Sequence, residues 1–204
     1  MNIDYFDNIR NDVIDFIPEG SYERILEVGG GEFSSLIEIG KRFSAETWGI
    51  DMYQNNKANI DCFIKGSIED LETEIQVPDS SFDIFMANDV LEHLVHTDNF
   101  INVANKKLKN GGLLVMSVPN VRSIRMIYYL LIKGSFPRHD AGLFDRTHLR
   151  WFCKKDVIEL CEENFKLLRH KTTGRFVSKM ISKNFFGELL GLQNIFIFQK
   201  RIQK

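Results

Sequence analysis

The sequence has few of the residues and patterns that mark secreted, membrane-spanning or nucleic-acid-binding proteins. Its 204 residues include three cysteines, an odd and widely spaced set that fits free thiols in a reducing compartment better than disulfides or a zinc site. No apolar run is long enough to cross a bilayer, and charges interrupt residues 1–20, where a signal peptide would be apolar. The formal net charge of -2 gives no support for nucleic-acid binding. These absences predict a cytoplasmic protein without a spanning segment, for which a nucleic-acid partner is not expected.

The order of apolar and polar residues predicts an α/β fold. Short apolar runs alternate with segments in which apolar residues recur at helical spacing, which is typical of a mostly parallel sheet with helices on both faces. With 44% hydrophobic residues the chain can bury one core, so residues 1–204 are predicted to form a single domain. An N-terminal helix is expected within residues 1–20, over 5–17. Further helices are expected over 34–43 and 89–108, and strands over 24–28, 47–50, 62–64, 82–87 and 113–118.

Three consecutive glycines, Gly29, Gly30 and Gly31, follow the first expected strand. A turn of this kind directs backbone N–H groups and the positive end of the next helix at a ligand. A dinucleotide loop, G-x-G-x-x-G, would need a glycine where Ser34 stands, and the Gly-Lys-Ser/Thr of a nucleoside triphosphate loop is missing. Glu27 precedes the glycines, and its carboxylate suits a ligand with a cationic group, such as the ammonium of an amino acid. The loop therefore disfavours a nicotinamide or nucleoside triphosphate ligand.

Asp51 stands at the end of the second expected strand, where a carboxylate can accept hydrogen bonds from both hydroxyls of a ribose. S-adenosylmethionine carries a ribose, an adenine and an amino-acid ammonium together. At these residues the chain resembles the class I S-adenosylmethionine-dependent methyltransferases, whose signature is E/D-x-G-x-G-x-G. Here the signature runs from Glu27 to Phe33, with Phe33 in place of the last glycine.

The resemblance extends over nearly the whole chain. Residues 82–83 (FD), 88–94 (NDVLEHL) and 108–112 (LKNGG) match family segments in the same order and spacing. Residues 142–152 (GLFDRTHLRWF) resemble a segment of a subgroup found beside enzymes that build sugars and surface glycans. The resemblance implies a Rossmann-like sheet of seven strands, mostly parallel with an antiparallel last strand. Its sixth and seventh strands would lie near 165–171 and 194–200.

The resemblance also implies which residues form the site. Those expected to act in catalysis are Asp89, His93 and His148. Asp89 and Glu92 have equally the spacing of a capping box at the start of the expected helix 89–108. Arg146 either holds an anionic acceptor group or pairs with Asp145. Those expected to bind the donor are Glu27, Gly29, Gly30, Gly31, Asp51, Met52, Ser67, Ile68 and Asn88.

The same residues are also candidates for binding a metal ion. Asp89, Glu92 and His93 resemble the E-x-x-E-H ligand set of small-RNA 2′-O-methyltransferases and some ubiquinone-pathway O-methyltransferases, with His148 as a further ligand. Carboxylate and imidazole groups suit magnesium, manganese or zinc, and the ion would orient an acceptor hydroxyl. The same segment is common in methyltransferases without metal, so the predicted cofactor is S-adenosylmethionine and no metal ligand is assigned.

Residues 120–150 are expected to form an insertion or lid on the acceptor side. The first part, 120–139, has four Lys or Arg residues among apolar ones and no acid. It suits a lid, an interfacial helix on anionic lipid or a lipid-linked glycan, or a helix packed on the domain or in a dimer.

The predicted function is methyl transfer to oxygen or nitrogen of a small-molecule acceptor, a sugar or glycan precursor. The alternative is a non-catalytic S-adenosylmethionine-binding partner of a glycan enzyme, with a nicotinamide oxidoreductase third. The acceptor and the oligomeric state stay open.

Overall fold

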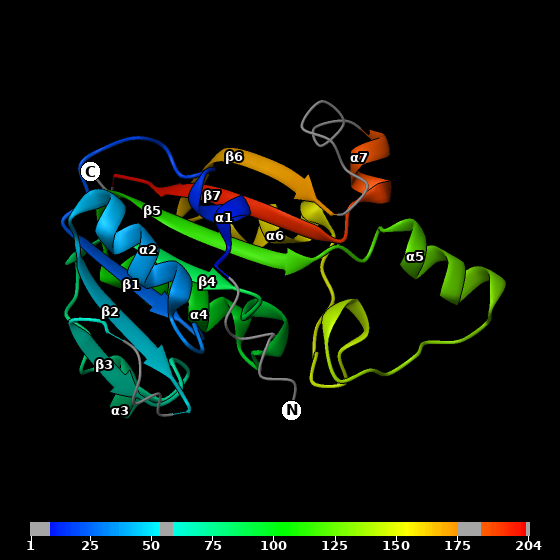
Figure 1. Ribbon diagram of the computed structural model, residues 1–204, viewed down its shortest axis with the longest axis horizontal. Coiled ribbons are helices and arrows are strands. Elements are labelled where there is room, and N and C mark those ends of the chain that lie inside the picture. Colours follow the sequence, from blue (N-terminus) through cyan, green and yellow to red (C-terminus); the bar gives the residue numbers. More distant parts are fainter. Residues whose placement is uncertain (1–8, 54–58, 175–184, 203–204) are drawn as a thin grey trace.

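A single seven-stranded sheet organises the chain, in the order β3-β2-β1-β4-β5-β7-β6 (Figure 1). The computed structural model describes residues 9–53, 59–174 and 185–202. Strands β1 to β5 are parallel, and β7 runs antiparallel to both β5 and β6. This confirms the predicted Rossmann-like class. The strands are β1 Arg24–Val28, β2 Glu46–Asp51, β3 Cys62–Lys65, β4 Phe82–Asn88, β5 Leu108–Pro119, β6 Phe165–Thr173 and β7 Gln193–Lys200.

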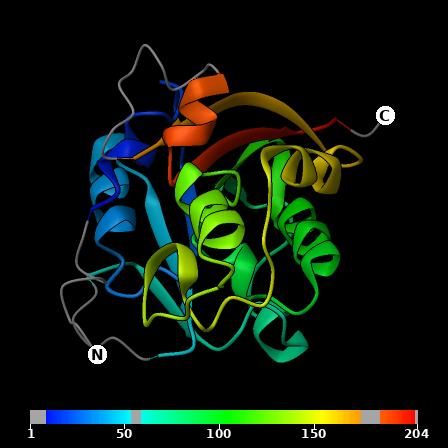
Figure 2. The same ribbon diagram turned by 90° about the vertical axis from the view of Figure 1, so that its right-hand side faces the viewer.

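Helices cover both faces of the sheet, with α1 and α2 on one side and α4 and α6 on the other (Figure 2). Because side chains alternate along a strand, neighbouring residues serve opposite cores: Ile25 packs in the α1–α2 core, whereas Leu26 packs in the α4–α6 core. The described helices contain none with the length and apolar character needed to cross a bilayer. They are α1 Asn11–Ile14, α2 Ser34–Phe43, α3 Leu71–Glu74, η2 Leu91–His93, α4 Thr97–Lys107, α5 Ile124–Ile127, η3 Tyr128–Ile132, η4 Gly142–Phe144, α6 Lys154–Cys161 and α7 Phe185–Leu190.

The N-terminal helix is shorter than expected. Within the described residues it spans only Asn11–Ile14, and the expected residues 5–8 lie outside that part. Val13 and Ile17 are buried against the sheet as the pattern predicts, but Ile9 is largely exposed. Tertiary contacts explain the difference: the backbone N–H of Arg10 donates to Ser35 Oγ at 2.9 Å, outside helical geometry. A bond to α2 therefore outweighs the local helical preference.

Residues 89–108 do not form the single helix that the sequence predicts. Asp89 has a left-handed backbone (φ 56°), a short 3-10 turn follows at Leu91–His93, and α4 begins only at Thr97. The Asp89 N–H donates to the Ser117 carbonyl on β5 at 3.0 Å, so the chain leaves β4 in sheet-like pairing and cannot start a helix there. The capping box is therefore wrong as well. At the other end, β5 already begins at Leu108, so the segment 108–112 belongs to that strand and the helix ends at Lys107.

Phe33, in place of the signature's last glycine, is the unusual feature of the first loop. It also has a left-handed backbone (φ 56°), yet its ring is fully buried. The ring fills the space left by two glycines, since a Cβ on Gly30 would lie 2.4 Å and one on Gly49 2.7 Å from its atoms. It also meets Phe63 edge to face, with ring centroids 6.0 Å apart. Core packing thus offsets the cost of a non-glycine residue in this conformation.

We expect Phe33→Ala to lower the free energy of unfolding by about 3–5 kcal/mol, because it leaves a cavity beneath the glycine loop. Chemical denaturation measures the loss. Phe136→Ala is the matched control, since Phe136 is partly exposed and should lose much less. Equal losses in the two variants would contradict the structural role assigned to Phe33.

Candidate active site

The predicted site residues gather at one edge of the sheet, because the carboxyl ends of the parallel strands meet there. β1 lies between β2 and β4, so the crossovers from β1 and β4 leave in opposite directions. Such a switch point opens a crevice beyond the strand ends in sheets of this kind. Glu27, Asp51 and Asn88 stand at the ends of β1, β2 and β4. The topology therefore confirms that these strand ends are neighbours.

The glycine loop is tied to the end of β2. Gly29 and Gly31 have φ values of 67° and 57°, which side chains rarely adopt, and a Cβ on Gly29 would lie 2.7 Å from Val90. Asp51 accepts hydrogen bonds from the backbone N–H of Gly31 at 3.0 Å and of Tyr53 at 2.9 Å. Asp51 therefore shapes the loop as well as presenting a carboxylate at the strand end.

Glu27 is a buried carboxyl group with incomplete hydrogen bonding. Only 3% of the residue is exposed, and Oε1 accepts from the Asn88 amide at 3.2 Å. Oε2 and the Asn88 Oδ1 have no hydrogen-bond partner among the described residues. Burial raises the pKa of Glu27 to about 7, against the opposing effect of the Asn88 amide. A cationic ligand group at Oε2 would satisfy this carboxylate, so the residues present fit an amino-acid ammonium.

Asp89 takes part in an ion pair that the sequence analysis missed. Arg10, 79 residues away, donates from Nη1 to Asp89 Oδ2 at 2.7 Å. Ser117 Oγ donates to the other oxygen, Asp89 Oδ1, at 3.2 Å, and Arg10 Nε contacts Asp12 Oδ1 at 2.9 Å. No spacing signal could have linked these residues, because the contact depends on how the N-terminal segment crosses the strand ends. Asp89 therefore has a structural partner, which the prediction of a catalytic role did not include.

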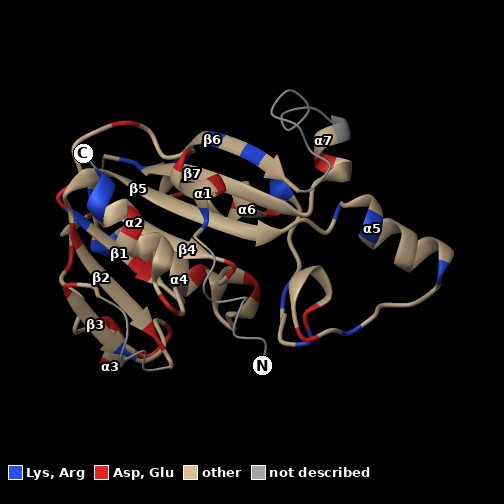
Figure 3. Ribbon diagram, viewed as in Figure 1, with Lys and Arg blue, Asp and Glu red and all other residues tan. Residues whose placement is uncertain are grey.

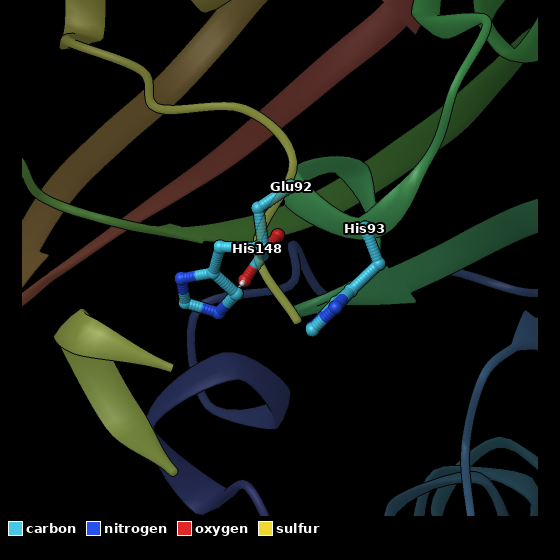
Figure 4. A group of neighbouring side chains, drawn as sticks. All are labelled: Glu92, His93 and His148. Atoms are coloured by element: carbon cyan, nitrogen blue, oxygen red, sulfur yellow. Dashed lines mark ion pairs between the residues drawn. The ribbon is translucent and has the colours of Figure 1, made fainter. Parts of the chain in front are cut away.

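Glu92, His93 and His148 form a cluster beside this ion pair (Figure 4). The Glu92 carboxylate points toward the His148 ring, with 3.9 Å between Glu92 Oε1 and His148 Nε2. Glu92 is 1% exposed, and neither carboxylate oxygen has a hydrogen-bond partner among the described residues. The His93 and His148 rings meet edge to face, with centroids 4.8 Å apart. The structure thus brings together two predicted catalytic histidines and Glu92, which is not among the residues that the sequence analysis expects to act in catalysis.

The loop that carries His148 is fastened to the turn that carries Glu92. The backbone N–H groups of Leu149 and Arg150 donate to the Glu92 carbonyl at 2.9 and 3.1 Å. His93 Nδ1 lies 3.3 Å from the Thr147 carbonyl oxygen, which favours a proton on Nδ1 and leaves Nε2 as the acceptor. These bonds hold the three side chains in a defined arrangement.

Of the two roles predicted for Arg146, the pair with Asp145 is wrong. Arg146 contacts Asp140 instead, with Nη2 and Oδ1 2.8 Å apart. Asp145 accepts from the Thr147 N–H at 2.8 Å and from the Thr147 hydroxyl at 2.6 Å, which closes a tight local turn. The turn stabilises the loop just before His148.

Burial removes charge from the cluster. It raises the pKa of Glu92 well above its usual range, and the nearby Asp89 adds to the rise. Burial also lowers the pKa of His148, and His93 adds to that fall. Both effects favour a protonated carboxyl facing a neutral imidazole, a pair that can exchange a proton with a bound group. One carboxylate and two imidazoles within 4.8 Å are also a chemically suitable donor set for a divalent cation such as zinc or manganese.

The other residues predicted to bind the donor lie toward β3. Met52 is exposed just after β2, and the Ser67 hydroxyl accepts from the Glu69 N–H at 3.2 Å. Ile68 is buried in the α4–α6 core with Ile50 and Ile64. Core packing therefore occupies the Ile68 side chain, and donor binding at Ile68 stays a prediction.

Comparison with known proteins places the chain among methyltransferase folds. The profile of a family described as a methyltransferase domain matches residues 4–164, and no curated protein matches the sequence. A SAM-dependent methyltransferase from Archaeoglobus fulgidus is 18% identical, with a TM-score of 0.62 and coverage of 98% of this chain and 89% of that one. The complex of a Haloferax volcanii Trm112 methyltransferase activator with a putative methyltransferase matches at 13% identity, a TM-score of 0.66 and coverage of 95% and 88%.

A third solved structure contains ligands. It is the 1,6-didemethyltoxoflavin-N1-methyltransferase of Burkholderia thailandensis, with bound 1,6-didemethyltoxoflavin and S-adenosylhomocysteine. It is 12% identical, with a TM-score of 0.60 and coverage of 89% of this chain and 72% of that one. At such identities the likeness of these structures establishes the fold.

The pKa of Glu27 predicts a pH-dependent stability. Because that pKa is raised from 4.5 to about 7 by burial, the stabilisation from protonated Glu27 is full at acidic pH and is lost as pH rises through about 7. Relative to Glu27→Gln, the free energy of unfolding of the wild type should fall by up to about 3 kcal/mol between about pH 5 and pH 8. Denaturant titrations at several pH values measure the difference. Parallel curves for the two proteins would show that Glu27 does not titrate in this range.

Proposed function

This chain belongs to the methyltransferase domain family and is an S-adenosylmethionine-dependent enzyme, and from that premise we propose that it methylates an oxygen or nitrogen atom of a small sugar or glycan precursor. The observation that carries the proposal is the buried Glu92 carboxyl group, which faces His148 beyond the carboxyl end of β4 and has no hydrogen-bond partner in the part of the chain that the structure describes. The proposal also takes residues 1–204 as one domain in which 120–150 cover the acceptor side.

We assign the donor to the ends of β1 and β2. S-adenosylmethionine supplies an activated methyl group on a sulfonium. The unpartnered Glu27 Oε2 suits its ammonium, the open turn at Gly29, Gly30 and Gly31 lets the backbone approach it, and Asp51 is placed for the ribose hydroxyls. Met52, Ser67 and Ile68 are assigned to the adenine side, and Asn88 to the turn between donor and acceptor.

The cluster is assigned to the acceptor proton. Methyl transfer is an in-line displacement, so positioning does most of the work, and a base is needed only where the acceptor atom still carries its proton. His148, held neutral by burial, can accept that proton on its imidazole, whose Nε2 faces the Glu92 carboxyl group. His93, fixed by Thr147, borders the same space. Asp89 acts through this arrangement by holding Arg10 and the turn in place.

The acceptor class rests on the loop around His148. Its sequence resembles a subgroup found beside enzymes of sugar and glycan synthesis, and Asp140 and Arg146 offer exposed polar groups to a hydroxylated acceptor. The Burkholderia structure, named for a small-molecule acceptor, has the same fold.

A non-catalytic binding module is disfavoured, because donor binding alone does not require a desolvated, unpartnered carboxyl at Glu92. Calorimetry with S-adenosylmethionine against NAD, followed by transfer of labelled methyl to nucleoside diphosphate sugars, tests the assignment. Failure of S-adenosylmethionine to bind would overturn it.

We expect His148→Ala to lower turnover by about 10²–10⁴-fold while changing the donor Kd by less than about threefold, because the variant loses a proton acceptor and no donor contact. Steady-state kinetics and donor calorimetry on each protein measure the two effects. His139→Ala is the matched control, since His139 lies exposed in the same loop outside the cluster. A parallel loss of turnover and donor binding would indicate a structural role for His148.

Chelation separates proton transfer from metal assistance at the cluster. Turnover should survive exhaustive dialysis against a chelator and should not rise when magnesium, manganese or zinc is added, because His148 and Glu92 act here without an ion. Metal analysis of the dialysed protein is the control. Loss of turnover that one divalent ion restores would assign Glu92, His93 and His148 as its ligands and reject the proton-transfer role.

A further inference from the structure

Residues 120–138, which we name the arm, project from the sheet beyond the end of β5 (Figures 1 and 2). The helix α5 continues directly into the π-helical turn η3, so that one helical segment runs from Ile124 to Ile132. Of this segment only Met126 is buried, in a small core with Leu143 and Phe144. The base of the arm is therefore anchored, whereas the rest of its surface faces outward.

The outward surface of the arm is strongly apolar. Leu131 and Ile132, near its tip, are 76% and 73% exposed. Trp151 packs edge to face on Phe136 at 5.5 Å and extends the apolar surface toward the His148 loop. A soluble helix normally turns one apolar stripe toward the core, so an exposed apolar helical segment of this kind marks an interaction surface. Its large exposed residues are Ile124, Ile127, Tyr128, Leu130, Leu131, Ile132, Phe136 and Trp151.

The charge of the arm has one sign. It contains four cationic residues, Arg122, Arg125, Lys133 and Arg138, and no Asp or Glu (Figure 3). Lys133 Nζ lies 5.8 Å from the Tyr128 ring centroid, and the Arg125 guanidinium lies 5.8 Å from that of Phe144. Cations placed beside aromatic rings and aliphatic tips are the combination that binds the interface of a bilayer, where the rings sit at headgroup level and the cations meet phosphates.

We propose that the arm docks on an anionic lipid surface. Leu131 and Ile132 enter the boundary between headgroups and acyl chains, and Arg125, Lys133 and Arg138 contact lipid phosphates. Arg122, at the base of the arm, instead pairs with Glu188, with 3.0 Å between Nη1 and Oε2. A second copy of this chain is the less suitable partner. A two-fold interface would place the same patch on both sides and would bring the three cations of one arm against those of the other.

Docking would place the site next to the membrane. The chain runs from the arm through η4, where the His139 N–H donates to the Phe144 carbonyl at 2.9 Å, and on to His148. If the proposed function holds, the acceptor is then a glycan precursor presented at the lipid surface. Lipid binding itself does not depend on that function and is tested separately.

Vesicle flotation of the full-length protein tests the docking. The wild type should float with phosphatidylglycerol vesicles and much less with phosphatidylcholine vesicles, and added salt should release it. Leu131→Glu/Ile132→Glu should lower the apparent lipid affinity by about tenfold or more, because it places two carboxylates in the interface. Leu71→Glu/Ile75→Glu is the matched control. These two residues, the first of α3 and the one that directly follows it, are similarly exposed and lie away from the arm (Figure 1), so this variant should bind as the wild type does.

Three results would overturn the proposal. The first is wild-type protein that stays in the soluble fraction with anionic vesicles. The second is an equal loss of binding in the α3 control. The third is a dimer, seen by light scattering, that Leu131→Glu/Ile132→Glu dissociates while vesicles bind neither protein. Circular dichroism confirms that each variant is folded, so that loss of flotation reports on the surface alone.

Discussion

Two carboxyl groups, Glu27 and Glu92, lie in the interior at the carboxyl edge of the sheet, and among the described residues Glu27 Oε2 and both oxygens of Glu92 have no hydrogen-bond partner. Removing such groups from water costs free energy, which the two hydrophobic cores on either face of the sheet must offset. The carboxyl edge of the sheet therefore contains two polar groups in apolar surroundings. One is at β1 beside the glycine turn, and the other is at β4 beside His148. Donor binding and acceptor chemistry are assigned to these two places.

The rest of the edge is arranged around these groups. The Arg10 side chain is held by Asp89 and Asp12, and its backbone N–H binds Ser35 of α2, so the N-terminal segment is fastened both to α2 and to the residue that follows β4. Asp89 leaves β4 in a left-handed conformation, and this break in the expected helix turns Glu92 inward. A continuous helix from that point would have placed the first acidic side chains at an exposed helix start. The irregular backbone is therefore what buries the carboxyl.

The glycine loop and the arm show two different uses of bulky residues. Phe33 stands where the family signature has a glycine, and its buried ring packs against Gly30 and Gly49 beneath the loop. Most apolar residues of the arm are exposed, and the buried Met126 packs in a separate small core with Leu143 and Phe144. Hydrophobic surface thus stabilises the donor loop in one case and stays available for a partner in the other. Because the arm contains cationic residues and no acidic ones, it favours a negatively charged partner.

Much of the fold could be predicted from the sequence, because strands and helices follow from local periodicity. β1 and α2 match the expected limits, and β2 and β4 extend only one residue further at an end, since buried strands and amphipathic helices are patterns of neighbouring residues. β7, whose limits the family resemblance implied, begins one residue earlier than expected. The glycine turn, Glu27 and Asp51 were likewise predictable, since each stands at the end of such a strand. The family resemblance of these segments was sufficient to predict the donor.

Contacts between distant residues were beyond this kind of prediction. The Arg10–Asp89 pair, the division of the helix after β4 and the approach of His148 to Glu92 each join segments whose separation in the chain has no fixed relation to their distance in space. The sequence by itself determined the strands, the donor loop and the family. Only the tertiary structure decided which polar groups lose their water, because burial depends on how the whole sheet, the His148 loop and the N-terminal segment close over one edge.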